Sequence, residues 1–166
     1  MTSIGFAALL AVAWGLLLIG CVESPDRAPS ATIVEVAPES LDPAADDADD
    51  LTLRVEYADG DADLGGGVAS VHDCRAEGLV VELVLPPIAS DEAIDDGVPI
   101  EGELELIVND VGWVEPDAAA PDACAELGAP DPAEGEAVFC VVLRDTAGHE
   151  GAGDCSAAVS IADPPA

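Results

Sequence analysis

Alternating aspartates are the feature of this chain that most directly suggests chemistry. Asp59, Asp61 and Asp63 are separated by single small residues in a glycine-rich segment. Calcium takes about six to eight oxygen ligands, and closely spaced carboxylates supply several of them from one short loop. The EF-hand pattern does not fit, because Leu64 stands at the place of its glycine and Ser70 at the place of its bidentate glutamate. The segment is therefore either a calcium loop of another kind or a solvated turn.

Enzymatic chemistry has little support in the sequence. The chain contains two histidines, His72 and His149, which are far apart. Ser70, His72 and Asp73 have the residue types of a catalytic triad, but on a strand the first two point to one face and the third to the other. Carboxylates are too numerous to single out an acid–base pair. We therefore expect a protein without catalytic residues.

The N-terminal segment predicts export. Residues 6–19 are apolar and uncharged, at about the length of a signal-peptide hydrophobic region and shorter than the ~20 residues of a membrane-spanning helix. The four residues from Leu18 to Cys21, Leu-Ile-Gly-Cys, resemble the lipobox of bacterial lipoproteins. The resemblance implies cleavage before Cys21 and a lipid on that cysteine. Residues 1–5 contain no lysine or arginine, which leaves an ordinary signal peptide or an uncleaved anchor as alternatives.

The lipoprotein resemblance also sets the expected organisation. It implies a cleaved signal peptide over residues 1–20, a lipidated tether over residues 21–30 and a folded domain over residues 31–166. Diacylglyceryl and acyl groups on Cys21 would hold the protein in the lipid bilayer of a bacterial cell envelope. Val22 follows the cysteine in place of the aspartate that often retains such proteins at the inner membrane, which favours the outer membrane.

The chain is extremely acidic. It has 35 acidic residues against four arginines and no lysine, which gives a formal net charge of -31. Nucleic acid is excluded as a partner, because its affinity comes from cationic residues that neutralise phosphates. Electrostatic docking on anionic lipid headgroups is excluded for the same reason. The acidity is either a solvated surface, which a saline habitat would screen, or a set of ligands for divalent cations.

Hydrophobic alternation predicts an all-β fold. Apolar residues recur at every second position in several segments, which is the pattern of a half-buried strand, and glycine, proline and aspartate separate the segments. A short helix is expected in the long segment 109–136, with Pro121 in its first turn and Gly128 just past its end. The seven predicted strands are residues 32–36, 51–57, 68–72, 79–85, 100–108, 139–143 and 157–161.

The segment that begins at Phe139 resembles the penultimate strand and following turn of bacterial immunoglobulin-like domains. Those domains often read aromatic-x-Val-x-Val-x-Asp-x-Ala-Gly-Asn at this place, and here His149 replaces the final asparagine. The resemblance implies an immunoglobulin-like β-sandwich of about seven strands and implies no activity. The matching residues are Phe139, Val141, Leu143, Asp145, Ala147 and Gly148.

In such a sandwich the loops after the second and the sixth strand share one end. Asp145, Glu150 and Asp154 would then approach the alternating aspartates. Without a cation, so many carboxylates at one end would repel one another. The predicted calcium ligands are Asp59, Asp61, Asp63, Asp145 and Asp154.

Four cysteines remain after Cys21, and an even number in an exported domain predicts two disulfides. The preferred pairing is Cys124–Cys140, which closes a short loop, with Cys74–Cys155. The immunoglobulin-like resemblance implies another, Cys74–Cys140 with Cys124–Cys155, because the third and sixth strands of that fold are neighbours. A metal–thiolate site is disfavoured, because the sequence has no Cys-x-x-Cys spacing.

Trp113 lies in the long segment that follows the fifth predicted strand. Loop aromatics often anchor proteins or glycans, whereas others plug the edge of a fold. Two functional hypotheses follow. The first is a non-catalytic, lipid-anchored envelope or surface protein with a structural or adhesive role, stiffened by calcium. The alternative is a binding subunit that recognises a peptide, a glycan or an envelope partner through the 109–137 loop.

Overall fold

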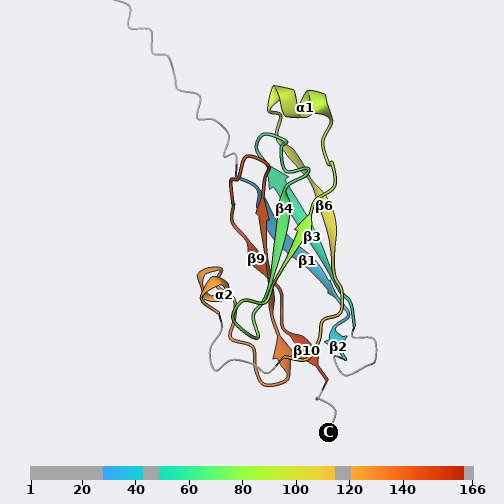
Figure 1. The fold of residues 1–166 in the computed structure, drawn as a ribbon, viewed down its shortest axis with the longest axis vertical. Helices are drawn as coiled ribbons and strands as arrows, with labels where there is room; N and C mark the ends of the chain where they lie inside the picture. Colours follow the sequence, from blue (N-terminus) through green and yellow to red (C-terminus); the bar gives the residue numbers. More distant parts are fainter. Residues whose placement is uncertain (1–27, 43–48, 115–120, 163–166) are drawn as a thin grey trace, which may run out of the picture.

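The computed structural model describes residues 28–42, 49–114 and 121–162, which form a mostly β structure (Figure 1). The predicted signal peptide 1–20 and Cys21 lie outside these residues. Neither of the two described helices has the length and apolar composition needed to cross a membrane.

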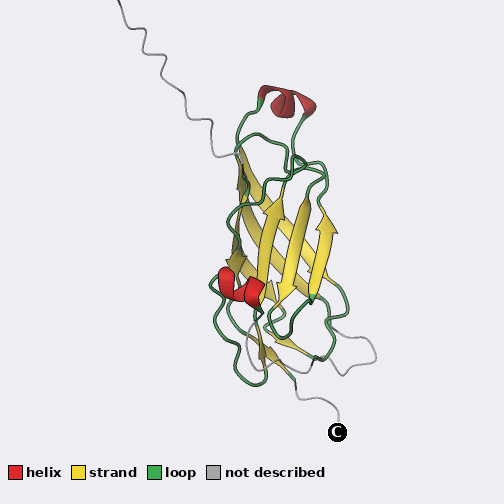
Figure 2. Ribbon diagram, turned by 60° about the vertical axis from the view of Figure 1, so that its left-hand side comes forward, coloured by secondary structure: helices red, strands yellow, loops and turns green. Residues whose placement is uncertain are grey.

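Two antiparallel sheets form the body of the molecule and lie one over the other (Figure 2). The first sheet contains, in spatial order, β1 (Ser30–Ala37), β3 (Leu51–Asp59) and β6 (Ile100–Val108). The second contains, in spatial order, β5 (Val80–Val84), β4 (Val68–Asp73), β8 (Phe139–Arg144) and β9 (Asp154–Cys155).

Smaller elements lie at the ends of these layers. Helix α1 (Asp91–Asp96) connects β5 to β6 at one end, and a small third sheet lies at the other end (Figure 1). Helix α2 (Asp122–Glu126) begins after Pro121 and is followed by Gly128 at a φ of 77°, which confirms the predicted short helix. The third sheet contains, in spatial order, β2 (Ser40–Leu41), β10 (Val159–Ile161) and β7 (Glu136–Ala137).

Alternation along the strands accounts for the core. On β3, Leu53 and Val55 are buried while Arg54 between them is exposed. Strand β8 is buried at five successive positions, because its two faces contact two different apolar clusters. The larger cluster includes buried residues of both main sheets, such as Val55 and Phe139. All seven predicted strands are present, whereas β2, β7, β9 and α1 were not predicted.

Two disulfides brace the second sheet, and their pairing differs from both predictions. Cys74 bonds to Cys124, and Cys140 bonds to Cys155. Cys140 and Cys155 lie opposite each other in the register of β8 and β9, so strand register decides this pair. Cys74 directly follows β4, and the cysteine that remains for it is Cys124 on α2. The preferred pairing Cys124–Cys140 with Cys74–Cys155 is therefore wrong.

A non-reducing tryptic digest of the denatured protein distinguishes the observed pairing from the preferred one. With the observed pairing, three fragments stay joined as one species in mass spectrometry. With the preferred pairing, the middle fragment would be released with an internal bridge. The fragments are 55–75 with Cys74, 76–144 with Cys124 and Cys140, and 145–166 with Cys155.

The second alternative would also join the three fragments, so it needs a further cut. Cleavage at Glu126, Glu134 or Glu136 separates Cys124 from Cys140. We then expect two linked pairs, one with Cys74 and Cys124 and the other with Cys140 and Cys155. Any other combination would contradict the fold, because the second pair is set by the β8–β9 register.

Candidate metal centre

Four aspartates converge at the end of the molecule that carries α1 (Figure 1). One carboxylate oxygen from each of Asp59, Asp61, Asp63 and Asp145 lies within 4.8 Å of the others. Asp59 ends β3, the next two lie in the loop that follows, and Asp145 directly follows β8. We call these four residues the aspartate cluster. The two loops that were predicted to share one end do meet.

Backbone contacts hold the two loops together. The backbone N–H and the hydroxyl of Thr146 both donate to the carbonyl oxygen of Asp63, at 3.2 Å each. Gly67 permits this approach, because a Cβ there would lie 2.2 Å from the carbonyl oxygen of Arg144. Ala62 has a φ of 65°, which is uncommon outside glycine, and turns the chain directly before Asp63. The sequence therefore brings the carboxylates together through loop geometry.

Asp59 is the most buried member of the aspartate cluster, with 3% of the residue exposed. Its Oδ2 accepts a hydrogen bond from the backbone N–H of Leu64 at 3.1 Å. Among the described residues, its buried Oδ1 has no hydrogen-bond partner, and neither has Oδ1 of Asp63. A buried acceptor without a partner costs about 1–3 kcal/mol, and more when it is charged. Oxygens in this situation are the ones expected to ligate a cation.

Burial and like charge raise the pKa of two members of the cluster. Desolvation is the largest cause for both Asp59 and Asp63. For Asp59, the hydrogen bond from the Leu64 backbone N–H partly offsets desolvation, and the charges of Asp63 and Asp145 raise the pKa further. The pKa of Asp63 is further raised by its hydrogen bond with Asp61 and by the charge of Asp145. A bound cation would reverse these effects, because it favours the ionised carboxylates.

Asp145 is held in place by the turn that follows it. The backbone N–H of His149 donates to Asp145 Oδ1 at 2.8 Å, and His149 Nδ1 lies 2.8 Å from Oδ2. The backbone N–H of Asp145 in turn donates to the His149 carbonyl oxygen at 3.1 Å. His149 takes the place of the asparagine in the immunoglobulin-like pattern. Its role in this structure is to orient the buried Asp145 carboxylate.

The donor set of the cluster fits calcium. Calcium binds oxygen at about 2.3–2.6 Å, so ligands on opposite sides of the ion are about 4.6–5.2 Å apart. The cluster oxygens, all within 4.8 Å of one another, can lie on such a sphere. Magnesium prefers shorter distances and keeps more water, and zinc prefers nitrogen and sulfur ligands. The chain thus offers four carboxylates to one hard cation.

Asp154 was predicted as a fifth ligand, but the structure does not bring it to the cluster. It lies on β9, where its Oδ2 accepts a hydrogen bond from the backbone N–H of Ile33 at 2.9 Å. Ile33 lies next to an irregularity in the β1–β3 register, and the Asp154 carboxylate supplies the acceptor for its backbone N–H there. Glu150, which was also expected to approach the cluster, is exposed, and its backbone forms an isolated antiparallel β-bridge with Arg144. Asp154 therefore connects β1 with β9.

The remaining candidates lie away from the aspartate cluster. Trp113 follows β6 and is 45% exposed, so it does not plug the edge of the fold. Asp73, once considered beside His72 for a triad, instead binds the buried side chain of Arg75. Sequence reasoning missed the Asp73–Arg75 pair, because nothing in the residue order signals that an arginine is buried.

Comparison with protein-family models, with curated proteins and with solved structures gives no match for this chain. A function therefore has to be argued from the geometry and chemistry of the sites.

The raised pKa values predict how metal-free stability depends on pH. The unfolded chain has ordinary carboxyl pKa values near the reference of 3.8, whereas Asp59 and Asp63 are raised in the fold. The folded state therefore binds protons more tightly, and these two groups add stability as pH falls from neutral toward that reference. After metal removal on a chelating resin, we expect the melting temperature to increase as the pH is lowered from about 7 to about 5.

Saturating calcium should remove or reverse that rise, because the metal needs ionised carboxylates. Relief of the general negative charge at lower pH acts in both samples, so the difference between the two pH profiles is the informative measurement. Parallel profiles with and without calcium would show that the aspartate cluster does not bind the ion.

Proposed function

We propose that this protein is a non-catalytic, immunoglobulin-like module that calcium stabilises at one end and that a lipid on Cys21 holds at the bacterial envelope. The observation that carries the calcium part is the buried Asp59 carboxylate, which lies in a cluster with three other aspartates and whose Oδ1 has no hydrogen-bond partner among the described residues. The role is structural or adhesive, because the cation would join two loops of a β-sheet framework.

The strand order supports the immunoglobulin-like assignment. The chain passes from β3 in one sheet to β4 in the other, returns for β6, and crosses again to β8. The motif that begins at Phe139 coincides with β8 and its following turn. In this arrangement the second and sixth predicted strands end at the same place, which is where the aspartate cluster forms.

The first described strand begins at the same end of the molecule as the aspartate cluster. Ser30 at the start of β1 is opposite Ala58, one residue before Asp59. Eight residues lie between Cys21 and Ser30, so the Cα atoms of these two residues can be at most about 30 Å apart. A lipid on Cys21 would turn the cluster toward the membrane. A calcium ion there would reduce the repulsion between an acidic domain and anionic headgroups.

Calcium titration of an isosteric variant tests the metal site. In the wild-type protein, calcium about 100-fold above its dissociation constant should stabilise the fold by about 2.7 kcal/mol, or roughly 5–10 °C in melting temperature. Asp59→Asn removes one buried charge, so the metal-free variant should melt no lower than the metal-free wild type. Most of its calcium-induced shift should be lost, as measured by differential scanning calorimetry.

Asp154→Asn is the matched control, because the same change is made at an acidic residue that the structure places on β9. Its calcium-induced shift should equal that of the wild type. An equal shift in Asp59→Asn and wild type would overturn the proposed site, and so would an equal loss in both variants.

Metabolic labelling tests the anchor separately. In a bacterial host that receives a clickable fatty acid, the wild-type protein should carry the label. It should also sediment with the membrane fraction and be released from it by detergent. Cys21→Ala should lose both properties, while Val22→Ala, the neighbouring control, should keep them. Labelling of Cys21→Ala at the wild-type level would reject the lipoprotein assignment and leave the calcium site unaffected.

A further inference from the structure

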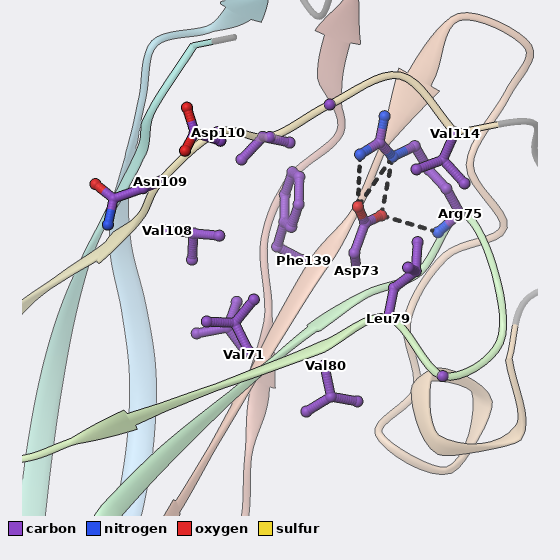
Figure 3. Close-up of a pocket in the computed structure, with 14 residues that line it drawn as sticks. Val71, Asp73, Arg75, Leu79, Val80, Val108, Asn109, Asp110, Val114 and Phe139 are labelled. Carbon is purple, nitrogen blue, oxygen red and sulfur yellow. Dashed lines mark hydrogen bonds and ion pairs between the residues drawn. The ribbon is translucent and has the colours of Figure 1, made fainter.

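A pocket of about 240 Å³ (Figure 3) is lined by residues at the ends of β4 and β6, and the strand register places it at the end of the molecule away from the aspartate cluster. Residues of β4, β8 and the start of β5 form one side of it, and the end of β6 with the loop 109–114 forms the other. Most of its lining is aliphatic or aromatic, and its volume suits one aliphatic side chain with part of a backbone. Apolar lining residues include Val71, Leu79, Val80, Val108, Val114 and Phe139.

The polar feature of this pocket is a buried ion pair. Arg75 is 3% exposed, and its Nε and Nη2 donate to the Asp73 carboxylate at 2.9 Å and 2.5 Å. Asp73 Oδ1 also accepts the Arg75 backbone N–H at 3.1 Å. This bidentate arrangement fixes the guanidinium plane between Phe139 and Val114 (Figure 3). The side chain is therefore rigid before any ligand arrives.

One nitrogen of that guanidinium is left over. Among the described residues, Arg75 Nη1 is buried and has no hydrogen-bond partner. It points away from Asp73, toward the loop that carries Val114 (Figure 3). A charged donor that is buried without an acceptor destabilises the fold, so an acceptor supplied by a ligand is favoured at this place. Because Nη1 is buried in this structure, a ligand reaches it only when part of the surrounding wall is displaced, and the loop 109–114 with Gly112 forms the wall on that side.

Charge indicates which acceptor fits. Asp73 already neutralises the guanidinium, and Asp110 lies on the wall of the same pocket. A carboxylate would therefore bring an excess negative charge into an apolar site of a protein with a net charge of -31. A neutral acceptor avoids this cost, and the carbonyl oxygen of a peptide bond is the common one.

The neighbouring strand can hold a peptide backbone. Among the described strands, β5 pairs with β4 alone and forms the edge of its sheet, so alternate backbone N–H and C=O groups along it have no partner in that part of the chain. Its side chains are unusually apolar for an edge, with Val80 44%, Val81 40% and Val84 78% exposed. Edges of this kind accept an added strand from another chain. Trp113, on the loop beside the pocket, is exposed as well.

We propose that β5 and this pocket bind an extended, uncharged peptide segment of another protein. Its backbone pairs with the β5 edge, one aliphatic side chain enters the pocket, and one carbonyl oxygen accepts from Arg75 Nη1. The proposal rests on the described fold alone and is independent of the calcium site and of the lipid.

Isothermal titration calorimetry of the full-length protein with acetyl-Thr-Val-Thr-Val-Thr-amide tests the proposal. This probe is neutral and forms extended structure readily. We expect saturable binding, and valine-methyl NMR should show the largest shifts at Val81 and Val114. The anionic analogue acetyl-Thr-Val-Thr-Val with a free carboxylate should bind at least about tenfold more weakly.

Two variants locate the binding. Val81→Lys places a charge at the pocket on a side chain that is already 40% exposed and that shares the face of Val71, and Asp73→Asn/Arg75→Gln removes the ion pair without leaving a lone buried charge. Each should weaken binding by at least about tenfold. Val34→Lys on β1 is the matched control, because Val34 is 43% exposed on the edge of the other sheet. It should bind like the wild type.

Three results would overturn the proposal. The first is no saturable binding of the neutral probe at millimolar concentration. The second is equal weakening by Val81→Lys and Val34→Lys, which would indicate non-specific association. The third is tighter binding of the anionic analogue than of the neutral probe, which would show that Arg75 selects a carboxylate.

Discussion

An excess of negative charge that the chain cannot balance internally is the constraint on which the rest of the structure depends. The three described arginines, Arg54, Arg75 and Arg144, each already contact a carboxylate, against 35 acidic residues in the sequence. Many of the carboxylates occupy the outward positions of alternating strands, where water solvates them and ion pairs add little stability. The aspartate cluster differs, because two of its members are almost fully buried. A cation from outside is the direct way to balance the negative charge of those carboxylates.

Strand direction gives the molecule two unlike ends. The start of β1 and the end of β3 lie at the end that holds the aspartate cluster, whereas β6 carries the chain away from it to the pocket. The nine residues of β6 correspond to about 30 Å. In the proposed orientation, the first end would face the membrane and the second would face outward. The cation site would then serve the anchored side, and the open β5 edge would be available to a partner.

The sequence predicted the parts of this structure that depend on local pattern. Burial of one face requires alternation, so β3 and β6 could be read from residue order. The approach of Asp145 to the alternating aspartates followed from a family pattern of strand connections. Strand register is not visible in the order of residues, and it decides that Cys140 meets Cys155 and that Asp154 bonds to Ile33. These are the places where the predicted disulfides and the predicted fifth ligand were wrong.

The Asp73–Arg75 pair could not be predicted either, and its presence argues for a role beyond stability. Replacement of a buried ion pair by apolar residues is often neutral or stabilising, so stability alone is weak grounds for keeping one. A chain with four cations also has few to spare, yet it places one of them at 3% exposure. The arrangement leaves Nη1 without an acceptor among the described residues, where a leucine would have packed without that penalty. A ligand that supplies the acceptor accounts for both features together.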